Sequence, residues 1–168
     1  IWDKGNLNVV PKTPGMINTE YAREALKNGL ALEATLGANP FKFGLAGGTD
    51  SHTGLTTADE NSYFGKFPSS EPSPERWSEN AYDFDGRTVK GWELGASGYT
   101  AVWAMANTRE AIWDAMKRKE TYGSTGPRMT VRFFGGYEFS PDDAQSRYLA
   151  EVGYTKGVPM GGDLKPAT

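Results

Sequence analysis

The sequence contains no cysteine and only one histidine, His52, among its 168 residues. The lack of cysteine excludes disulfides and thiolate metal sites but does not fix the compartment. Basic residues are not in excess, since the formal net charge is −3, so no nucleic-acid partner is expected. No run approaches about 18 consecutive apolar residues, and no membrane span is expected. Glycine and proline, at 21 and 10 residues, are frequent and indicate long loops.

Apolar periodicity and turn residues predict an alternation of helices and strands, which is typical of the α/β class. The clearest helix covers residues 18–37, with Asn18 or Thr19 as its cap and Gly37 at the position that favours a left-handed residue. The other expected elements are a buried strand at 41–48, an irregular region at 57–98, a second helix at 107–119 with Asn107 as its cap, strands at 120–125 and 128–134, and a last element at 148–154.

The single histidine follows an aspartate by two positions, at the end of the first expected strand. Residues two apart in an extended segment point to the same face, with Cα atoms roughly 6.5 Å apart, so Asp50 and His52 can converge on one ion. A carboxylate and an imidazole suit zinc, manganese or iron. The carboxyl end of a buried α/β strand is also where such folds place their sites. The alternative is a turn in which Asp50 accepts from backbone N–H groups and His52 lies at the surface.

Other constellations are less specific. The hydroxyl residues beside His52 do not predict a catalytic triad, because neighbours in an extended segment face opposite ways and no G-x-S-x-G motif occurs. The stretch "GSTGPR" at 123–128 offers hydroxyls, backbone N–H groups and Arg128 to an anion, but a β-turn before a strand is the favoured interpretation. It lacks the lysine and spacing of a P-loop.

A metal centre needs about four ligands, and this sequence offers one histidine and no cysteine. Two explanations remain open at this point. The site is carboxylate-rich, with Asp59 or Glu60 beside His52 as a Mg²⁺ site inside this chain, or the other ligands lie on sequence beyond these residues.

Long stretches of the chain carry a family resemblance. They are "NPFKFGLAGGTDSHTGL", "FGK", "ASGYTAVWAMANTREAIWDAMKRKETYGSTGPRMTVRFFGGYEF" and "AEVGYTKGVPMGGDL". In this order they closely resemble the domain of unknown function 3604 family, over essentially the whole chain. One departure is "GGTDSHTG", where the family more usually has a serine before the threonine.

That family resembles a branch of the polymerase and histidinol phosphatase (PHP) superfamily, which implies a distorted (β/α)7 barrel of the TIM-like kind with two or three metals at the carboxyl ends of its strands. The resemblance matches Asp50 and His52 to the last Asp-x-His metal motif. The earlier His-x-His and Thr-Asp-His motifs have no counterpart here, so the chain is expected to be the C-terminal portion of a longer protein. Residues 1–127 would then be late barrel elements with a long insertion at 57–98, and residues 128–168 a strand and the start of a β-rich domain.

The function implied by the resemblance is metal-assisted hydrolysis of a phosphoester or related small-molecule ester. Divalent Mn, Zn or Fe would be the cofactor, and the missing N-terminal segment of the same protein would be the partner that completes the site. A bacterial periplasmic or extracellular location is favoured over a cytoplasmic one. The alternative is a non-catalytic binding or structural module with a vestigial pair. The expected site residues are Asp50 and His52 as catalytic metal ligands, with Thr49, Ser51, Thr53 and Arg128 as substrate contacts.

Overall fold

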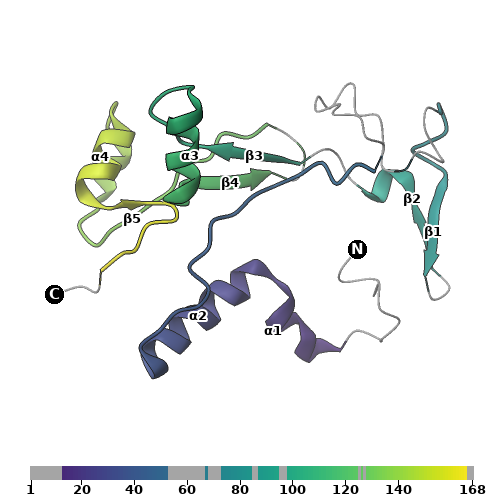
Figure 1. Cartoon of the computed structure of the whole chain (residues 1–168), viewed down its shortest axis with the longest axis horizontal. Helices are drawn as coiled ribbons and strands as arrows, with labels where there is room; N and C mark the ends of the chain where they lie inside the picture. Colours follow the sequence, from purple (N-terminus) through teal and green to yellow (C-terminus); the bar gives the residue numbers. More distant parts are fainter. Residues whose placement is uncertain are drawn as a thin grey trace. The chain divides into compact units, whose positions relative to one another are not determined.

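The computed structural model describes residues 13–52, 67, 73–84, 87–94, 98–124, 126 and 128–165. Its elements (Figure 1) are η1 (Pro14–Met16), α1 (Ile17–Glu20), α2 (Ala22–Leu36), β1 (Asn80–Phe84), β2 (Arg87–Lys90), η3 (Gly91–Leu94), β3 (Tyr99–Val102), α3 (Arg109–Lys117), β4 (Thr121–Ser124), β5 (Phe134–Gly135), η4 (Pro141–Gln145), α4 (Leu149–Lys156) and β6 (Val158–Pro159).

These strands form antiparallel pairs, β1 with β2, β3 with β4 and β5 with β6. The chain divides into two compact units, one of residues 1–42 and 49–97, the other of residues 43–48 and 98–168. The class seen in the described residues is therefore a mixture of helices and small antiparallel sheets. The (β/α)7 barrel and the domain boundary after residue 127 stay predictions. None of the helices in this described part is long and apolar enough to cross a membrane.

The first predicted helix is confirmed at its carboxyl end. Gly37 closes α2 with φ of 73°, and its N–H donates to the Glu33 carbonyl. Gly29 is buried against Asn39, whose side-chain oxygen would lie 2.3 Å from an added Cβ. The predicted cap at Asn18 or Thr19 is wrong, because Tyr21 is extended, with φ −111° and ψ 141°, and separates α1 from α2.

The prediction that residues 57–98 are irregular is wrong for 80–84 and 87–94. There β1 and β2 form a hairpin in which Val89 is 1% exposed. Thr88 donates its hydroxyl to Asp83 across the hairpin at 2.6 Å, and Lys90 donates to the Asn80 side chain at 2.6 Å. The prolines that suggested irregular structure all precede the hairpin, so their effect does not extend to it.

In the second unit, β3 and β4 form a hairpin whose connection carries α3. The predicted helix at 107–119 is shorter, and its cap is Thr108 rather than Asn107. The Thr108 hydroxyl accepts from the Ala111 N–H at 3.2 Å, while its own backbone is extended. Asparagine and threonine are both favourable N-cap residues, and Thr108 is the cap because its extended backbone directly precedes the first helical residue, Arg109. The strand predicted at 120–125 is confirmed as β4.

Segment 43–48 lies on one face of the β3–β4 hairpin without forming a strand, so the buried strand predicted at 41–48 is wrong. Side chains rather than backbone groups bind it. Thr121 donates its hydroxyl to the Leu45 carbonyl at 2.8 Å. Thr100 donates to the Gly47 carbonyl at 2.6 Å and accepts from the Gly47 N–H at 3.0 Å. Leu45 is 45% exposed.

The other face of the same hairpin carries the segment that follows β4. Tyr122 donates its hydroxyl to the Met129 carbonyl at 2.9 Å, and the Trp103 indole N–H donates to the Val131 carbonyl at 2.8 Å. Side chains again occupy carbonyls that a strand partner would use. Of the strand predicted at 128–134, only Phe134 is in a strand, β5 (Phe134–Gly135), which pairs with β6.

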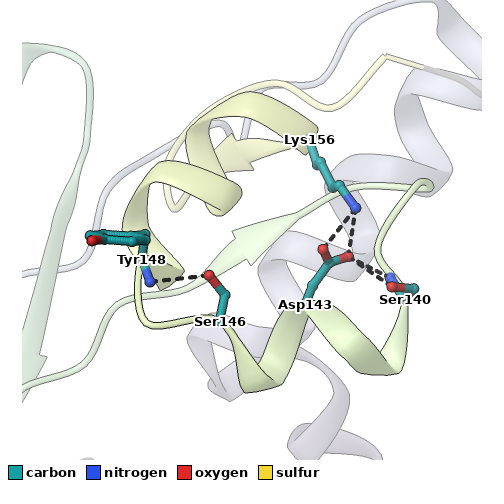
Figure 2. A network of polar contacts seen from close by, with 5 residues as sticks. All are labelled: Ser140, Asp143, Ser146, Tyr148 and Lys156. Carbon is teal, nitrogen blue, oxygen red and sulfur yellow. Dashed lines mark hydrogen bonds and ion pairs between the residues drawn. The ribbon is translucent and has the colours of Figure 1, made fainter.

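The element predicted at 148–154 is confirmed as helix α4. Lys156, at its end, donates to both carboxylate oxygens of Asp143 in η4 at 2.7 and 2.9 Å (Figure 2). Asp143 also accepts from the Ser140 N–H at 2.7 Å, which completes a capping box. These contacts hold η4 and the end of α4 together, and the lysine hydrogen bond is the largest cause of a lowered Asp143 pKa.

Candidate metal site

The sole histidine lies in a tight turn whose geometry is set by Thr49 and Asp50. Asp50 has φ of 50°, in the left-handed region that aspartate tolerates better than most residues. The Ser51 N–H donates to the Thr49 hydroxyl at 3.2 Å, a local turn contact typical of threonine. The turn thus differs from the predicted strand end.

The two candidate ligands meet. Nε2 of His52 lies 3.3 Å from Oδ1 of Asp50, and the side chains are 55% and 78% exposed respectively. The imidazole also makes an edge-on contact with Phe67, with ring centroids 5.3 Å apart and planes at 85°. The left-handed Asp50 brings the carboxylate toward the ring, and the contact with Phe67 supports one side of the ring.

The separation of the two ligand atoms suits a shared metal ion. Zinc binds imidazole nitrogen and carboxylate oxygen at about 2.0–2.2 Å, and two ligand atoms at a tetrahedral angle then lie about 3.4 Å apart. The observed 3.3 Å between Oδ1 of Asp50 and Nε2 of His52 is close to that value. The same distance also suits a hydrogen bond when Nε2 carries the proton, so metal binding requires the other tautomer, with the proton on Nδ1.

The pair does not form a full metal centre with other described residues. In that part of the chain, no group of three or more His, Cys, Asp or Glu side chains is placed to hold a metal ion. Thr53, Asp59 and Glu60 lie outside the described residues. The donor types and the separation fit a divalent ion, and two ligands are fewer than the number such an ion needs.

Arg128 belongs to the other compact unit. Its guanidinium carbon lies 5.3 Å from the centroid of the Tyr99 ring, a cation–π distance. The structure therefore brings Thr49, Asp50, Ser51 and His52 into one turn and places Arg128 against Tyr99 on the β3–β4 hairpin.

A buried polar network in the second unit was missed by sequence reasoning. Glu120 is 2% exposed and accepts from the Tyr154 hydroxyl and from Nε of Arg118 at 2.8 Å. Arg132 lies over the Trp103 ring at 4.2 Å and donates to the Tyr154 oxygen at 2.8 Å. The mostly apolar run of residues 99–103, interrupted only by Thr100, could have predicted β3, but nothing in the sequence predicts that Tyr154 reaches Glu120.

Comparison with known proteins shows the family to which this chain belongs. The profile of the family described as "Protein of unknown function (DUF3604)" matches residues 1–168. The chain belongs to this family. No curated protein and no solved structure matches it significantly.

Proposed function

We propose that this chain contributes part of the metal site of a metal-dependent hydrolase, with Asp50 and His52 as ligands of a divalent ion. The observation that supports the proposal best is the 3.3 Å between Oδ1 of Asp50 and Nε2 of His52, which suits two ligands of one ion. The substrate class, a phosphoester or related ester, follows from the resemblance of the family to PHP proteins.

In this proposal each residue of the turn has a role. Asp50 and His52 bind the ion, and Thr49 fixes the turn through its hydrogen bond to the Ser51 N–H. A bound divalent ion supplies a water of lowered pKa and positive charge for the ester oxygens. The remaining ligands come from outside the described residues.

A non-catalytic module is the second candidate, and the exposure of the pair favours it. The His52 and Asp50 side chains are 55% and 78% exposed, and side chains this exposed can form a surface hydrogen bond with each other when no metal ion is bound. In that case, the pair is a vestige that binds no ion tightly.

Metal titration separates the two candidates. We expect Mn²⁺ or Zn²⁺ to bind the chain. Asp50→Asn and His52→Gln should each lower the metal affinity by more than about tenfold, because mutating even a residue that only hydrogen-bonds to a metal ligand lowers the affinity by about 10–100-fold. Asp114→Asn, a matched change at an exposed position on α3, should leave the affinity unchanged. Equal affinity in all variants would overturn the assignment of Asp50 and His52 as ligands and leave the non-catalytic module.

A further inference from the structure

A second polar site lies at the open end of the β3–β4 hairpin. Tyr99 and Ser124 pair directly across the two strands, so their side chains project from the same face with Cβ atoms roughly 5 Å apart. Ser124 is only 8% exposed. The Tyr99 and Ser124 hydroxyl oxygens are both buried and have no hydrogen-bond partner.

Two buried hydroxyls without partners at one position are unusual in a folded protein. Each loses its hydrogen bonds to water on folding and regains none, whereas most buried polar groups are satisfied. The nearby hydroxyl of Tyr122, on the same strand face, donates to the Met129 carbonyl. Within the part of the chain that the structure describes, the buried side-chain groups without a partner are the hydroxyls of Tyr99 and Ser124, and a polar ligand that reaches both would satisfy them.

Among the described residues, a positively charged side chain lies beside Tyr99. The guanidinium carbon of Arg128 lies 5.3 Å from the centroid of the Tyr99 ring. At the opposite end of the same hairpin face, the Glu120 carboxylate accepts from Arg118 and Tyr154, so its negative charge is compensated there. A guanidinium with two hydroxyl donors suits the several acceptor oxygens of an oxyanion. It disfavours a metal cation.

We propose that Tyr99, Ser124 and Arg128 bind a tetrahedral oxyanion, namely phosphate, either free or as the phosphate group of an ester. The two hydroxyls donate to its oxygens, and the guanidinium supplies the charge. All three residues belong to the unit of residues 43–48 and 98–168. The proposal needs no metal and does not rest on the proposed function.

Titration of the full chain with inorganic phosphate, against chloride at equal ionic strength, tests the proposal. We expect saturable binding by calorimetry and a phosphate-dependent rise in melting temperature. Tyr99→Phe and Ser124→Ala should each weaken phosphate binding by about tenfold or more, because each removes a hydrogen bond to a charged group. Arg128→Gln should weaken it at least as much. Glycerol phosphate binding as well as phosphate identifies an ester ligand, and binding of phosphate alone identifies the free ion.

The matched control is Tyr122→Phe, which removes a hydroxyl that is already hydrogen-bonded. It should lower the melting temperature in both salts without changing phosphate affinity. Tyr99→Phe should do the reverse, leaving the melting temperature in chloride unchanged or higher and losing the phosphate response.

The absence of saturable phosphate binding, or equal affinity in all variants, would overturn the proposal and assign the hydroxyls to buried water. If a variant fails to fold, the unmodified chain still decides the question. Phosphate should protect Arg128 from phenylglyoxal in peptide mass mapping, and equal modification with and without phosphate would contradict the proposal.

Discussion

Removal of one hydroxyl should loosen the attachment of helix α4 to the start of strand β4. In Tyr154→Phe, the buried Glu120 carboxylate loses the hydroxyl that donates to its Oε1 and keeps Arg118 at 2.8 Å on Oε2. Glu120 is 2% exposed, so water does not easily replace the lost donor. Arg132 also loses its acceptor on Tyr154, but Arg132 is exposed and water can take that place.

The size of the effect follows from the charge of the acceptor. Hydrogen bonds to charged groups contribute about 1.5–3 kcal/mol, more than neutral ones. The aromatic contact should survive, because phenylalanine retains the ring that lies edge-on to Phe134 at 4.9 Å. We therefore expect Tyr154→Phe to lower the free energy of opening α4 by about 1.5–3 kcal/mol. Tyr148→Phe, at a residue 71% exposed, should change it by less than about 0.5 kcal/mol.

Native-state hydrogen exchange measured by mass spectrometry is the appropriate assay, because it reports the opening of α4 separately from the rest of the chain. The Val152 and Gly157 amides, which donate to the Tyr148 and Gly153 carbonyls, are the probes. A double-mutant cycle with Glu120→Gln should give a coupling energy above about 0.5 kcal/mol. Equal protection in Tyr154→Phe and Tyr148→Phe, or a coupling energy near zero, would refute the reasoning.

Three further predictions concern the same unit. Gly153→Ala should destabilise the chain in urea unfolding, because the added Cβ would lie 2.4 Å from the Phe134 ring. Overpacking costs about 1–3 kcal/mol, which outweighs the gain of about 1 kcal/mol in helix propensity. A more stable variant would contradict this packing. The hydrogen bond from Lys156 is the largest cause of the lowered pKa of Asp143, and the resulting stability is present above the ordinary pKa of 3.8 and lost as the pH falls below it. The melting temperature of Asp143→Asn should therefore lie below that of the unmodified chain at neutral pH and converge with it in acid. A difference that stays constant with pH would exclude this cause. Thr108→Ala removes the cap of α3 and should cost about 1 kcal/mol in the same urea assay, whereas an unchanged midpoint would show that the cap is not needed.

Local rules predicted the elements whose signals lie within the element itself. Gly37 closes α2 because a left-handed residue is needed there, and the apolar periodicity that precedes it does not depend on tertiary contacts. The second helix and β4 were predicted for similar reasons. The hairpin at 80–90 was missed because the prolines before it dominated the interpretation of the whole region.

The strands predicted at 41–48 and 128–134 failed for a tertiary reason. Hydroxyls of Thr100 and Thr121 take up backbone groups of the first segment, and the side chains of Trp103 and Tyr122 take up carbonyls of the second. An apolar run in the sequence does not show that side chains, rather than a neighbouring strand, will hydrogen-bond to its backbone groups. In the candidate site, the spacing of Asp50 and His52 predicted that their side chains converge. A turn with His52 at the surface was the alternative to a strand end, but the left-handed conformation of Asp50 was not predicted.

The most direct test of the proposed metal site uses the fact that His52 is the only histidine. Imidazole ¹H–¹⁵N correlation spectra of the labelled chain therefore report this residue alone, without assignment of other rings. On addition of Zn²⁺, the account predicts a large shift of Nε2, a proton on Nδ1, and loss of both effects in Asp50→Asn. An Nε2 that keeps its proton and its shift at saturating Zn²⁺ would contradict the claim that Asp50 and His52 hold a metal ion.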